Sequence, residues 1–241
     1  MTEATTDPAP DSGPPLTRQQ ISDAVGGLGW RFAVGVIRTS VLVDSLASAA
    51  EVARVVTDVA GAADGSLSLD LRPDRVVITL QSHEEGRVRP REIEAAARIS
   101  AAVDDLGLVT EPEVGSDGAR SVQVLEIAID ALDIPAVRPF WKAVLGYGDE
   151  PGSDGSQPDA GLADPVGQGP TFWFQQMDEP RPQRNRIHFD VVVPHDETER
   201  RIQAALDAGG RLVNDAEAPA FWVLADPEGN EACVCTWLGR D

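Results

Sequence analysis

A repeated tetrapeptide limits how the second half of this 241-residue chain can fold. Leu162-Ala163-Asp164-Pro165 returns as Leu224-Ala225-Asp226-Pro227, 62 residues later. The same offset places a strand pattern over 122–130 on a second strand pattern over 185–193. A matched order of elements at one offset indicates an internal duplication.

Each of these strands leads into a helix pattern, and further short strands follow. The helices are expected over 134–145 and 196–208, and each ends at glycine. The sequence therefore predicts two βαβββ units of about 60 residues. Because each unit leaves one face of its sheet bare, the two should close over a shared cavity.

Alternation along the strands separates an apolar face from a polar one. Ile127 and Ile129 have the parity that should pack on the helices, whereas Glu126 has the opposite parity. The offset makes His188 the counterpart of Glu126, and Asp190 shares the parity of His188. We expect this polar face to line either solvent or a wet pocket.

The closing strands of the two units carry aromatic and sulfur side chains. Phe172-Trp173-Phe174 is expected to supply an apolar wall, with Trp173 as a ligand contact. Cys233 and Cys235 share one face and are too close in an extended strand for a disulfide. Reduced thiols indicate a cytoplasmic protein.

The first half of the chain shows long helices beside short strands. Helices are expected over 17–25, 46–63 and 90–106, and strands over 30–43, 66–71 and 76–81. Pro90 suits the first turn of a helix, and Gly107 suits its end. The predicted class is α+β: a small antiparallel sheet covered by helices, followed by two βαβββ units that form a cupped sheet.

Two polar stretches set the predicted domain boundaries. Residues 1–15 have almost no apolar content, which predicts a disordered tail. Residues 110–120 are acidic and contain glycine, which predicts a linker. One domain is therefore expected over 16–109 and a second over 121–241.

The charge balance excludes several classes of partner. Forty acidic residues against 20 basic ones give a formal net charge of −20. A negative field repels phosphate backbones and anionic lipids, so neither nucleic acid nor a membrane is an expected partner. No apolar run approaches the roughly 18 residues of a membrane span, and the first residues lack the pattern of a secretory signal.

A strand-to-loop motif carries a family resemblance in the first half. Residues 76–84 read Val-Val-Ile-Thr-Leu-Gln-Ser-His-Glu, after a long helix and before a second helix that opens near Glu92. From Thr17 to Leu108 the chain resembles the pterin-4a-carbinolamine dehydratases, which remove water from 4a-hydroxytetrahydropterins such as 4a-hydroxytetrahydrobiopterin. The resemblance implies an α+β hydro-lyase with His83 as a catalytic residue.

One part of the family pattern is replaced. The family places His-His-Pro where this chain has Gly65-Ser66-Leu67. Dehydration needs a proton donor for the leaving hydroxyl and an acceptor for the ring N–H proton, and imidazole suits both near neutral pH. With His83 remaining, and Asp64 and Glu84 as candidate substitutes, we expect weakened or lost activity.

Three motifs carry a second resemblance, and they read Phe-Trp-Lys-Ala-Val-Leu-Gly at 140–146, Asn-Arg-Ile-His-Phe-Asp at 185–190 and Asp-Pro-Glu-Gly-Asn-Glu at 226–231. From Ser121 to Asp241 the chain resembles the glyoxalase/bleomycin-resistance/extradiol dioxygenase superfamily, the vicinal oxygen chelate proteins. Metal ligands of that superfamily fall here on Glu126, His188 and Cys233. The resemblance implies a candidate site for a divalent metal, although this trio is not the usual set.

The leading hypothesis is a dehydratase-type hydro-lyase fused to a glyoxalase-like domain. The alternatives are a metal-dependent glyoxalase or dioxygenase, and a non-catalytic protein that binds a small molecule. In a metal-free second domain, Glu126 would bond to His188 at the base of an organic-ligand pocket. The expected partner is a pterin or an unknown small molecule. No cofactor is certain, and homo-oligomerisation is left open.

Overall fold

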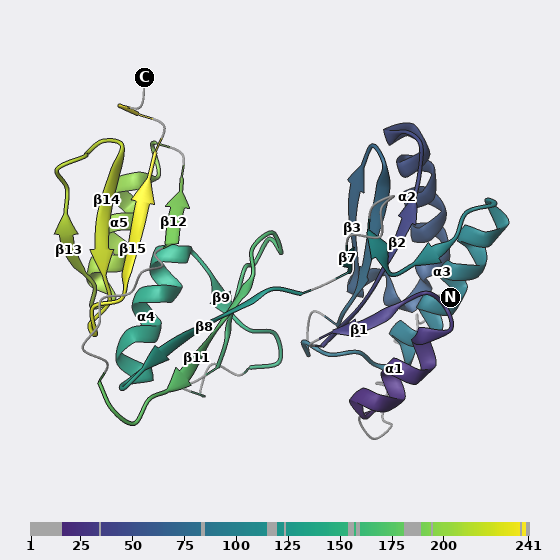
Figure 1. The fold of residues 1–241 in the computed structure, drawn as a ribbon, viewed down its shortest axis with the longest axis horizontal. Helices are drawn as coiled ribbons and strands as arrows, with labels where there is room; N and C mark the ends of the chain where they lie inside the picture. Colours follow the sequence, from purple (N-terminus) through teal and green to yellow (C-terminus); the bar gives the residue numbers. More distant parts are fainter. Residues whose placement is uncertain are drawn as a thin grey trace, which may run out of the picture. The chain divides into compact units, whose positions relative to one another are not determined.

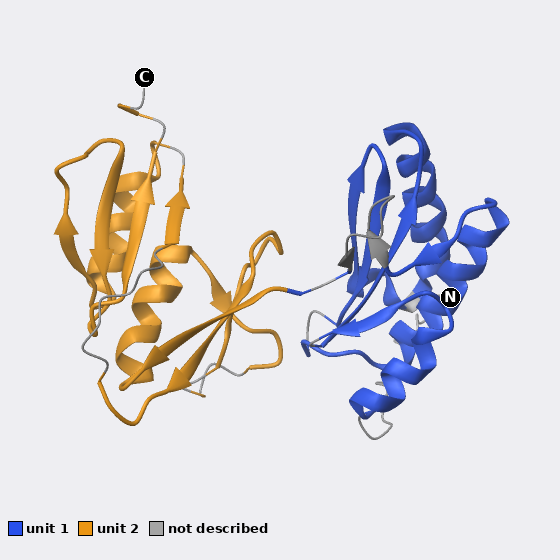
Figure 2. Ribbon diagram, viewed as in Figure 1, with its two compact units in different colours: residues 1–124 blue, residues 125–241 orange. Residues whose placement is uncertain are grey.

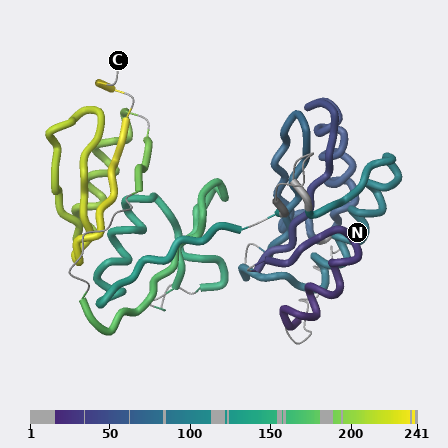
Figure 3. The backbone as a smooth tube through the Cα atoms, viewed as in Figure 1, coloured from purple at the N-terminus to yellow at the C-terminus, as the bar shows by residue number. Residues whose placement is uncertain are grey.

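The fold was analysed in a computed structural model, which describes residues 16–33, 35–82, 85–114, 120–122, 124–153, 157, 160–180, 189–193, 195–236 and 238–239. The chain forms two compact units, residues 1–124 and 125–241 (Figure 2). It completes the first unit before it enters the second, as the colour order in Figure 3 shows.

The first unit contains an antiparallel sheet. Strands β1 (Arg31–Ala33), β2 (Val36–Leu42), β4 (Arg75–Leu80) and β3 (Leu67–Arg72) lie in that order, and β5 (Thr110–Glu111) also pairs with β2. Strands β1–β2 and β3–β4 form two hairpins, which the antiparallel pairing of β2 with β4 joins into one sheet. Both hairpin regions match the strands expected from the sequence.

Helices cover one face of this sheet (Figure 1): α1 (Arg18–Gly26), α2 (Leu46–Ala60), the short 3₁₀ helix η1 (Gly61–Ser66) and α3 (Pro90–Asp105). Thr17 and Gln20 form a capping box at α1, and the Ser45 side chain caps α2. Pro90 occupies the first turn of α3, as predicted. The observed architecture confirms the α+β class.

Strand alternation places the core of this unit between the sheet and its helices. In β4, Val76, Ile78 and Leu80 are fully buried and alternate with partly exposed residues. They belong to a core to which the helices also contribute, through Val25 of α1, Val52 and Val56 of α2, and Ala96 and Ile99 of α3. The sheet-and-helix packing therefore depends on ordinary amphipathic patterning.

The segment expected to be a linker begins inside the first unit. Thr110–Glu111 pairs with β2, and the Thr110 hydroxyl donates to the Leu28 carbonyl at 2.8 Å. Strands β6 (Glu113–Val114) and β7 (Arg120–Ser121) then pair with each other. Thr110 and Glu111, which lie in the predicted linker 110–120, therefore pair within the sheet of the first unit.

The second unit contains two four-stranded sheets with the same topology. The first has the order β8 (Glu126–Ala131), β11 (Thr171–Gln176), β10 (Leu162–Ala163), β9 (Gly148–Asp149); the second has the order β12 (Phe189–Val192), β15 (Glu231–Cys235), β14 (Phe221–Ala225), β13 (Arg211–Asn214). In each, the first two strands named are parallel and the remaining pairs are antiparallel. Helices α4 (Ile134–Leu145) and α5 (Thr198–Asp207) follow the first strand of each sheet. The predicted pair of βαβββ units is confirmed.

The repeated tetrapeptide has a structural role in both sheets. The Asp164 carboxylate accepts hydrogen bonds from the backbone N–H groups of the turn after β10, and the Asp226 carboxylate does the same after β14; the donors are Val166, Gln168 and Gly169 in the first turn, and Glu228 and Asn230 in the second. An aspartate that gathers turn N–H groups fixes the reversal between two strands. The repeat therefore specifies the turn.

One aromatic side chain joins the two sheets into a single core. Trp141 of α4 stacks on Phe172 of β11 and meets Phe189 of β12 edge-on, with ring centroids 6.0 and 5.6 Å apart. Its indole N–H donates to Asp226 at 3.0 Å. The glyoxalase-type motif around Trp141 thus holds both βαβββ units together. Among the described helices of the whole chain, none is long and apolar enough to cross a membrane.

Candidate functional site

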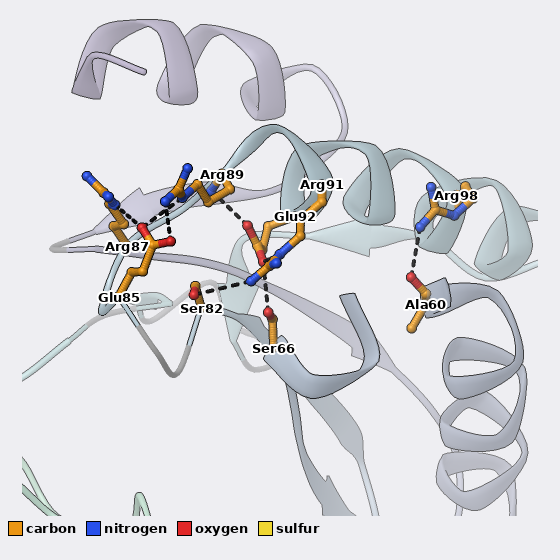
Figure 4. Close-up of polar contacts among 9 residues, drawn as sticks. All are labelled: Ala60, Ser66, Ser82, Glu85, Arg87, Arg89, Arg91, Glu92 and Arg98. Carbon is orange, nitrogen blue, oxygen red and sulfur yellow. Dashed lines mark hydrogen bonds and ion pairs between the residues drawn. The ribbon is translucent and has the colours of Figure 1, made fainter. Parts of the chain in front are cut away.

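A buried polar cluster lies where the first resemblance places its site. The Ser66 hydroxyl donates to Glu92 Oε1 at 2.7 Å, and the Glu92 side chain is fully buried (Figure 4). Arg91 Nε donates to the same Glu92 oxygen at 2.8 Å, and Arg91 Nη2 donates to Ser82 Oγ at 3.3 Å. A buried carboxylate requires such partners, because an uncompensated charge there costs several kcal/mol.

Three chain segments meet around this carboxylate, each close to the end or the start of a helix or strand. Ser66 is the last residue of η1, Ser82 follows β4, and Glu92 lies in the first turn of α3. The second oxygen of Glu92 accepts the backbone N–H of Arg89 at 2.7 Å, which satisfies a donor that the helix start leaves unpaired. Glu92 therefore connects the end of η1 to the start of α3.

Of the three catalytic residues predicted for the first unit, one lies within the described residues and two do not. His83 and Glu84 lie outside the described residues, directly after Ser82 in the sequence. Asp64 is exposed on η1. Sequence reasoning treated Glu92 only as a sign of the helix start and did not consider Arg91, because their contacts to Ser66 and Ser82 join segments that are distant in sequence.

The positions that match His-His-Pro have three different environments. Gly65 is exposed, and a Cβ added there would meet no atom within 4 Å. Ser66 is buried against Glu92, whereas Leu67 begins β3 and packs on the core. Only Gly65 therefore offers open space in which a larger side chain would fit.

Two candidate residues of the second unit, Glu126 and Trp173, lie on the face of the first sheet opposite α4. Glu126 is exposed and pairs in register with Thr171, and Trp173 is 39% exposed on the same face. Ile129 has the opposite parity and is buried, which agrees with the predicted division of faces. His188 lies outside the described residues, so its relation to Glu126 stays a prediction.

A second carboxylate lies near Glu126. Burial raises the pKa of the half-buried Glu150, and the negative charge of Glu126 raises it further. The Glu150 carboxylate lies over Gly161, where an added Cβ would come within 2.6 Å of its Oε2 atom. Glu150 directly follows β9, and only the folded sheet brings it near Glu126, so local sequence patterns did not reveal it.

We expect Glu150→Gln to stabilise the second unit at neutral pH. A carboxyl group whose pKa is raised in the folded state stabilises it below the unfolded pKa and loses that contribution as pH rises through the folded value. The amide should therefore raise the free energy of unfolding by about 0.5 kcal/mol at about pH 7, since solvent screens a half-exposed pair, and change little at about pH 4. Urea unfolding at the two pH values measures this, and equal gains at both would contradict it.

The second sheet pairs an exposed carboxylate with a buried thiol. Asp190 of β12 lies in register with Cys233 of β15. Burial, followed by the charge of Asp190 and its hydrogen bond to the thiol, raises the pKa of Cys233 to about 12. A thiol with this pKa is protonated at neutral pH, whereas metal ligation requires the thiolate.

The metal hypothesis is untested at its central residue. Among the described residues, no three His, Cys, Asp or Glu side chains gather in a way that could hold a metal ion. His188 is not one of these residues, so the trio Glu126, His188 and Cys233 remains a sequence prediction.

Cys233 and Cys235 should alkylate slowly in the folded protein. Both are buried, and the Cys233 thiol is almost entirely protonated at about pH 8. We expect iodoacetamide to react roughly a hundredfold more slowly than in urea-unfolded chain, as read by mass spectrometry. Asp190→Asn should accelerate labelling at Cys233, because it removes the charge that raises the thiol pKa. Rapid labelling of the unmodified protein would contradict this assignment.

Comparison with known proteins identifies both units. A family model described as pterin 4 alpha carbinolamine dehydratase matches residues 14–102, and one described as glyoxalase-like domain matches residues 126–235. A curated protein of Mycobacterium sp. (strain JLS), provisionally named as a pterin-4-alpha-carbinolamine dehydratase, is 32% identical over 90 residues, which are 37% of this chain and 96% of that relative. The chain belongs to the pterin-4a-carbinolamine dehydratase family. Its second unit is a glyoxalase-like domain, so both resemblances seen in the sequence are confirmed.

Solved structures resemble each unit separately. A transcriptional coactivator/pterin dehydratase from Brucella melitensis is 23% identical and covers 36% of this chain and 96% of its own, with a TM-score of 0.33. A glyoxalase/bleomycin resistance protein/dioxygenase family enzyme from Burkholderia phytofirmans PsJN is 22% identical and covers 47% of this chain and 97% of its own, with a TM-score of 0.36. On the geometry of this chain, the Ser66–Glu92 cluster is the first candidate site, and the faces carrying Glu126 and Cys233 are the second.

Proposed function

We propose that the first unit is a hydro-lyase of the 4a-hydroxytetrahydropterin dehydratase type with weakened activity. Membership of the dehydratase family supports the reaction class. We infer the lower activity from the environment of residues 65–67, where the chain has no imidazole and the Ser66 hydroxyl donates a hydrogen bond to Glu92.

The proposed reaction requires two proton transfers. The bond between ring carbon 4a and its hydroxyl oxygen breaks, and that oxygen leaves as water after it receives a proton. The neighbouring ring nitrogen loses its proton, and a carbon–nitrogen double bond forms. His83 is the proposed acid or base, with Glu84 and the exposed Asp64 as candidate partners. Each missing general acid or base typically costs 10²–10⁴-fold in rate.

Turnover of a 4a-hydroxytetrahydropterin by the full chain tests this function. We expect a rate at least roughly a thousandfold below that of a relative with intact His-His-Pro, and no detectable rate in His83→Ala. A full family rate in the unaltered chain would contradict the weakening. A rate unaffected by His83→Ala would contradict the role of His83.

We propose a small-molecule site in the second unit as the second candidate function. The partly exposed Trp173, on the same sheet face as Glu126, is the observation that favours it. Elemental analysis of protein purified without a histidine tag tests the metal-dependent form of this site. Stoichiometric metal that is lost in His188→Ala would support a metal enzyme, and metal-free protein would favour an organic ligand.

A further inference from the structure

Three arginines occupy alternate positions where the loop after β4 enters α3: Arg87 lies in the loop, Arg89 at the helix start and Arg91 in the first turn of α3. Arg87, Arg89 and Arg91 gather here in a chain whose acidic residues outnumber its basic ones by two to one. Arg91 bonds to Ser82 and Glu92 within the site. Because the backbone N–H of Arg89 also donates to Glu92, this arginine group is continuous with the candidate site.

Glu85 lies between two of these arginines (Figure 4). Its carboxylate accepts a hydrogen bond from Arg89 Nε at 2.8 Å, and it also pairs with Arg89 Nη2 and Arg87 Nε. The Arg89 hydrogen bond, more than the other contacts, lowers the pKa of Glu85, so the carboxylate is ionised at neutral pH. A guanidinium fork matches carboxylate and phosphate groups alike.

A tight turn fixes this group beside the site. The Gly86 N–H donates to the Ser82 carbonyl at 2.8 Å, and the Ser82 N–H donates to the Arg87 carbonyl at 3.0 Å. Gly86 has φ of +63°, a conformation that glycine adopts without steric cost. The turn therefore brings Arg87 back to Ser82, at the edge of the buried cluster.

The ion pairs that Glu85 forms with Arg87 and Arg89 can be exchanged for pairs with a ligand anion. The Arg89 side chain is only 17% exposed and so is held in place, whereas Arg87 is 48% exposed and Glu85 28% exposed. The more exposed Arg87–Glu85 pair contributes little net stability, so a ligand anion can replace the Glu85 carboxylate there at low cost, while the less exposed Arg89 stays in position to bind the anion.

We propose that Arg87 and Arg89 bind an oxyanion, a carboxylate or a phosphate, carried by the substrate of the first unit, and that Glu85 occupies this place in the unliganded protein. The inference rests on the proposed dehydratase-type function and names its substrate class: a pterin with an anionic substituent. A pterin with a neutral substituent would bind more weakly.

Fluorescence titration of the full chain tests this with three probes. They are 6-hydroxymethylpterin, its phosphate monoester and pterin-6-carboxylate. We expect one or both anionic probes to bind roughly tenfold or more tightly than the neutral probe, with a preference that falls as salt is added. The better anionic probe identifies the oxyanion. Equal or tighter binding of the neutral probe would overturn this inference alone, whereas no binding of any probe would overturn the proposed function with it.

Two variants distinguish specific anion binding by Arg87 and Arg89 from a general effect of positive charge. Arg87→Gln should lower the preference for the anionic probe several-fold, and Glu85→Gln should raise the affinity for that probe because it removes the internal competitor. Arg54→Gln is the matched control, since Arg54 pairs with Glu51 and Asp58 on the surface of α2. A preference that falls equally in Arg54→Gln, or an anion affinity that falls in Glu85→Gln, would overturn the proposal.

Discussion

Gly29→Ala is expected to destabilise the first unit by about 3 kcal/mol or more, because it combines backbone strain with a clash against main chain. Gly29 has φ of +79°, and an added Cβ would lie 1.9 Å from the Thr110 carbonyl oxygen. No side-chain rotation relieves this contact. Thr110 would have to move, and its strand pairing with β2 would weaken.

Gly27→Ala is the matched control for this prediction. Gly27 has φ of −70°, and nothing lies within 4 Å of an added Cβ. We expect Gly27→Ala to change the free energy of unfolding by less than about 1 kcal/mol, and we expect any change to be stabilising. Differential scanning calorimetry of the full chain measures both variants. Similar transition temperatures for the two variants would contradict the close approach at Gly29.

Asp226→Ala is expected to destabilise the second unit by roughly 3–5 kcal/mol, because it leaves buried donors without an acceptor. The buried Asp226 carboxylate accepts hydrogen bonds from the Trp141 indole at 3.0 Å and the Asn230 side chain at 2.7 Å, besides the turn N–H groups of Glu228 and Asn230. The loss therefore affects both the turn and the aromatic contact that joins the two sheets.

The internal repeat supplies the control for Asp226. Asp164 has the equivalent turn at a more exposed position, and the donors to its carboxylate among the described residues are backbone N–H groups. Asp164→Ala should therefore cost about 1 kcal/mol. Urea unfolding of the two variants compares them directly. Equal costs would show that the Trp141 contact adds nothing to the turn.

The ends of helices that carry capping residues could be predicted from the sequence. The ends of strands could not, because they depend on pairing with another strand. Asp133 and Gly146 cap α4, and both of its predicted ends are confirmed. The strand expected from residue 122 begins instead at Glu126, because its partner β11 begins at Thr171. A strand ends where its neighbour ends, and the neighbour is not visible in local alternation.

The candidate site shows the same limit more sharply. The family pattern located residues 65–67 and 83, but it did not reveal that Ser66 bonds to Glu92, 26 residues away. Likewise, parity placed Cys233 on a face, yet only the pairing of β12 with β15 brings Asp190 to it. Contacts between distant segments decide the protonation and burial of these groups, and one sequence carries little information about such contacts.

We propose that the Gly65–Ser66–Leu67 region is a dehydratase site without the imidazoles of its family, and turnover by Gly65→His is the sharpest test of this proposal. A Cβ added at Gly65 meets no atom within 4 Å, so the substitution begins without a clash. Gly65→Gln is the control of similar size that transfers no proton. We expect Gly65→His to dehydrate 4a-hydroxytetrahydropterin roughly 10–10² times faster than both the unaltered chain and Gly65→Gln, and we expect the addition of His83→Ala to abolish the gain. Equal rates in all three proteins would contradict it.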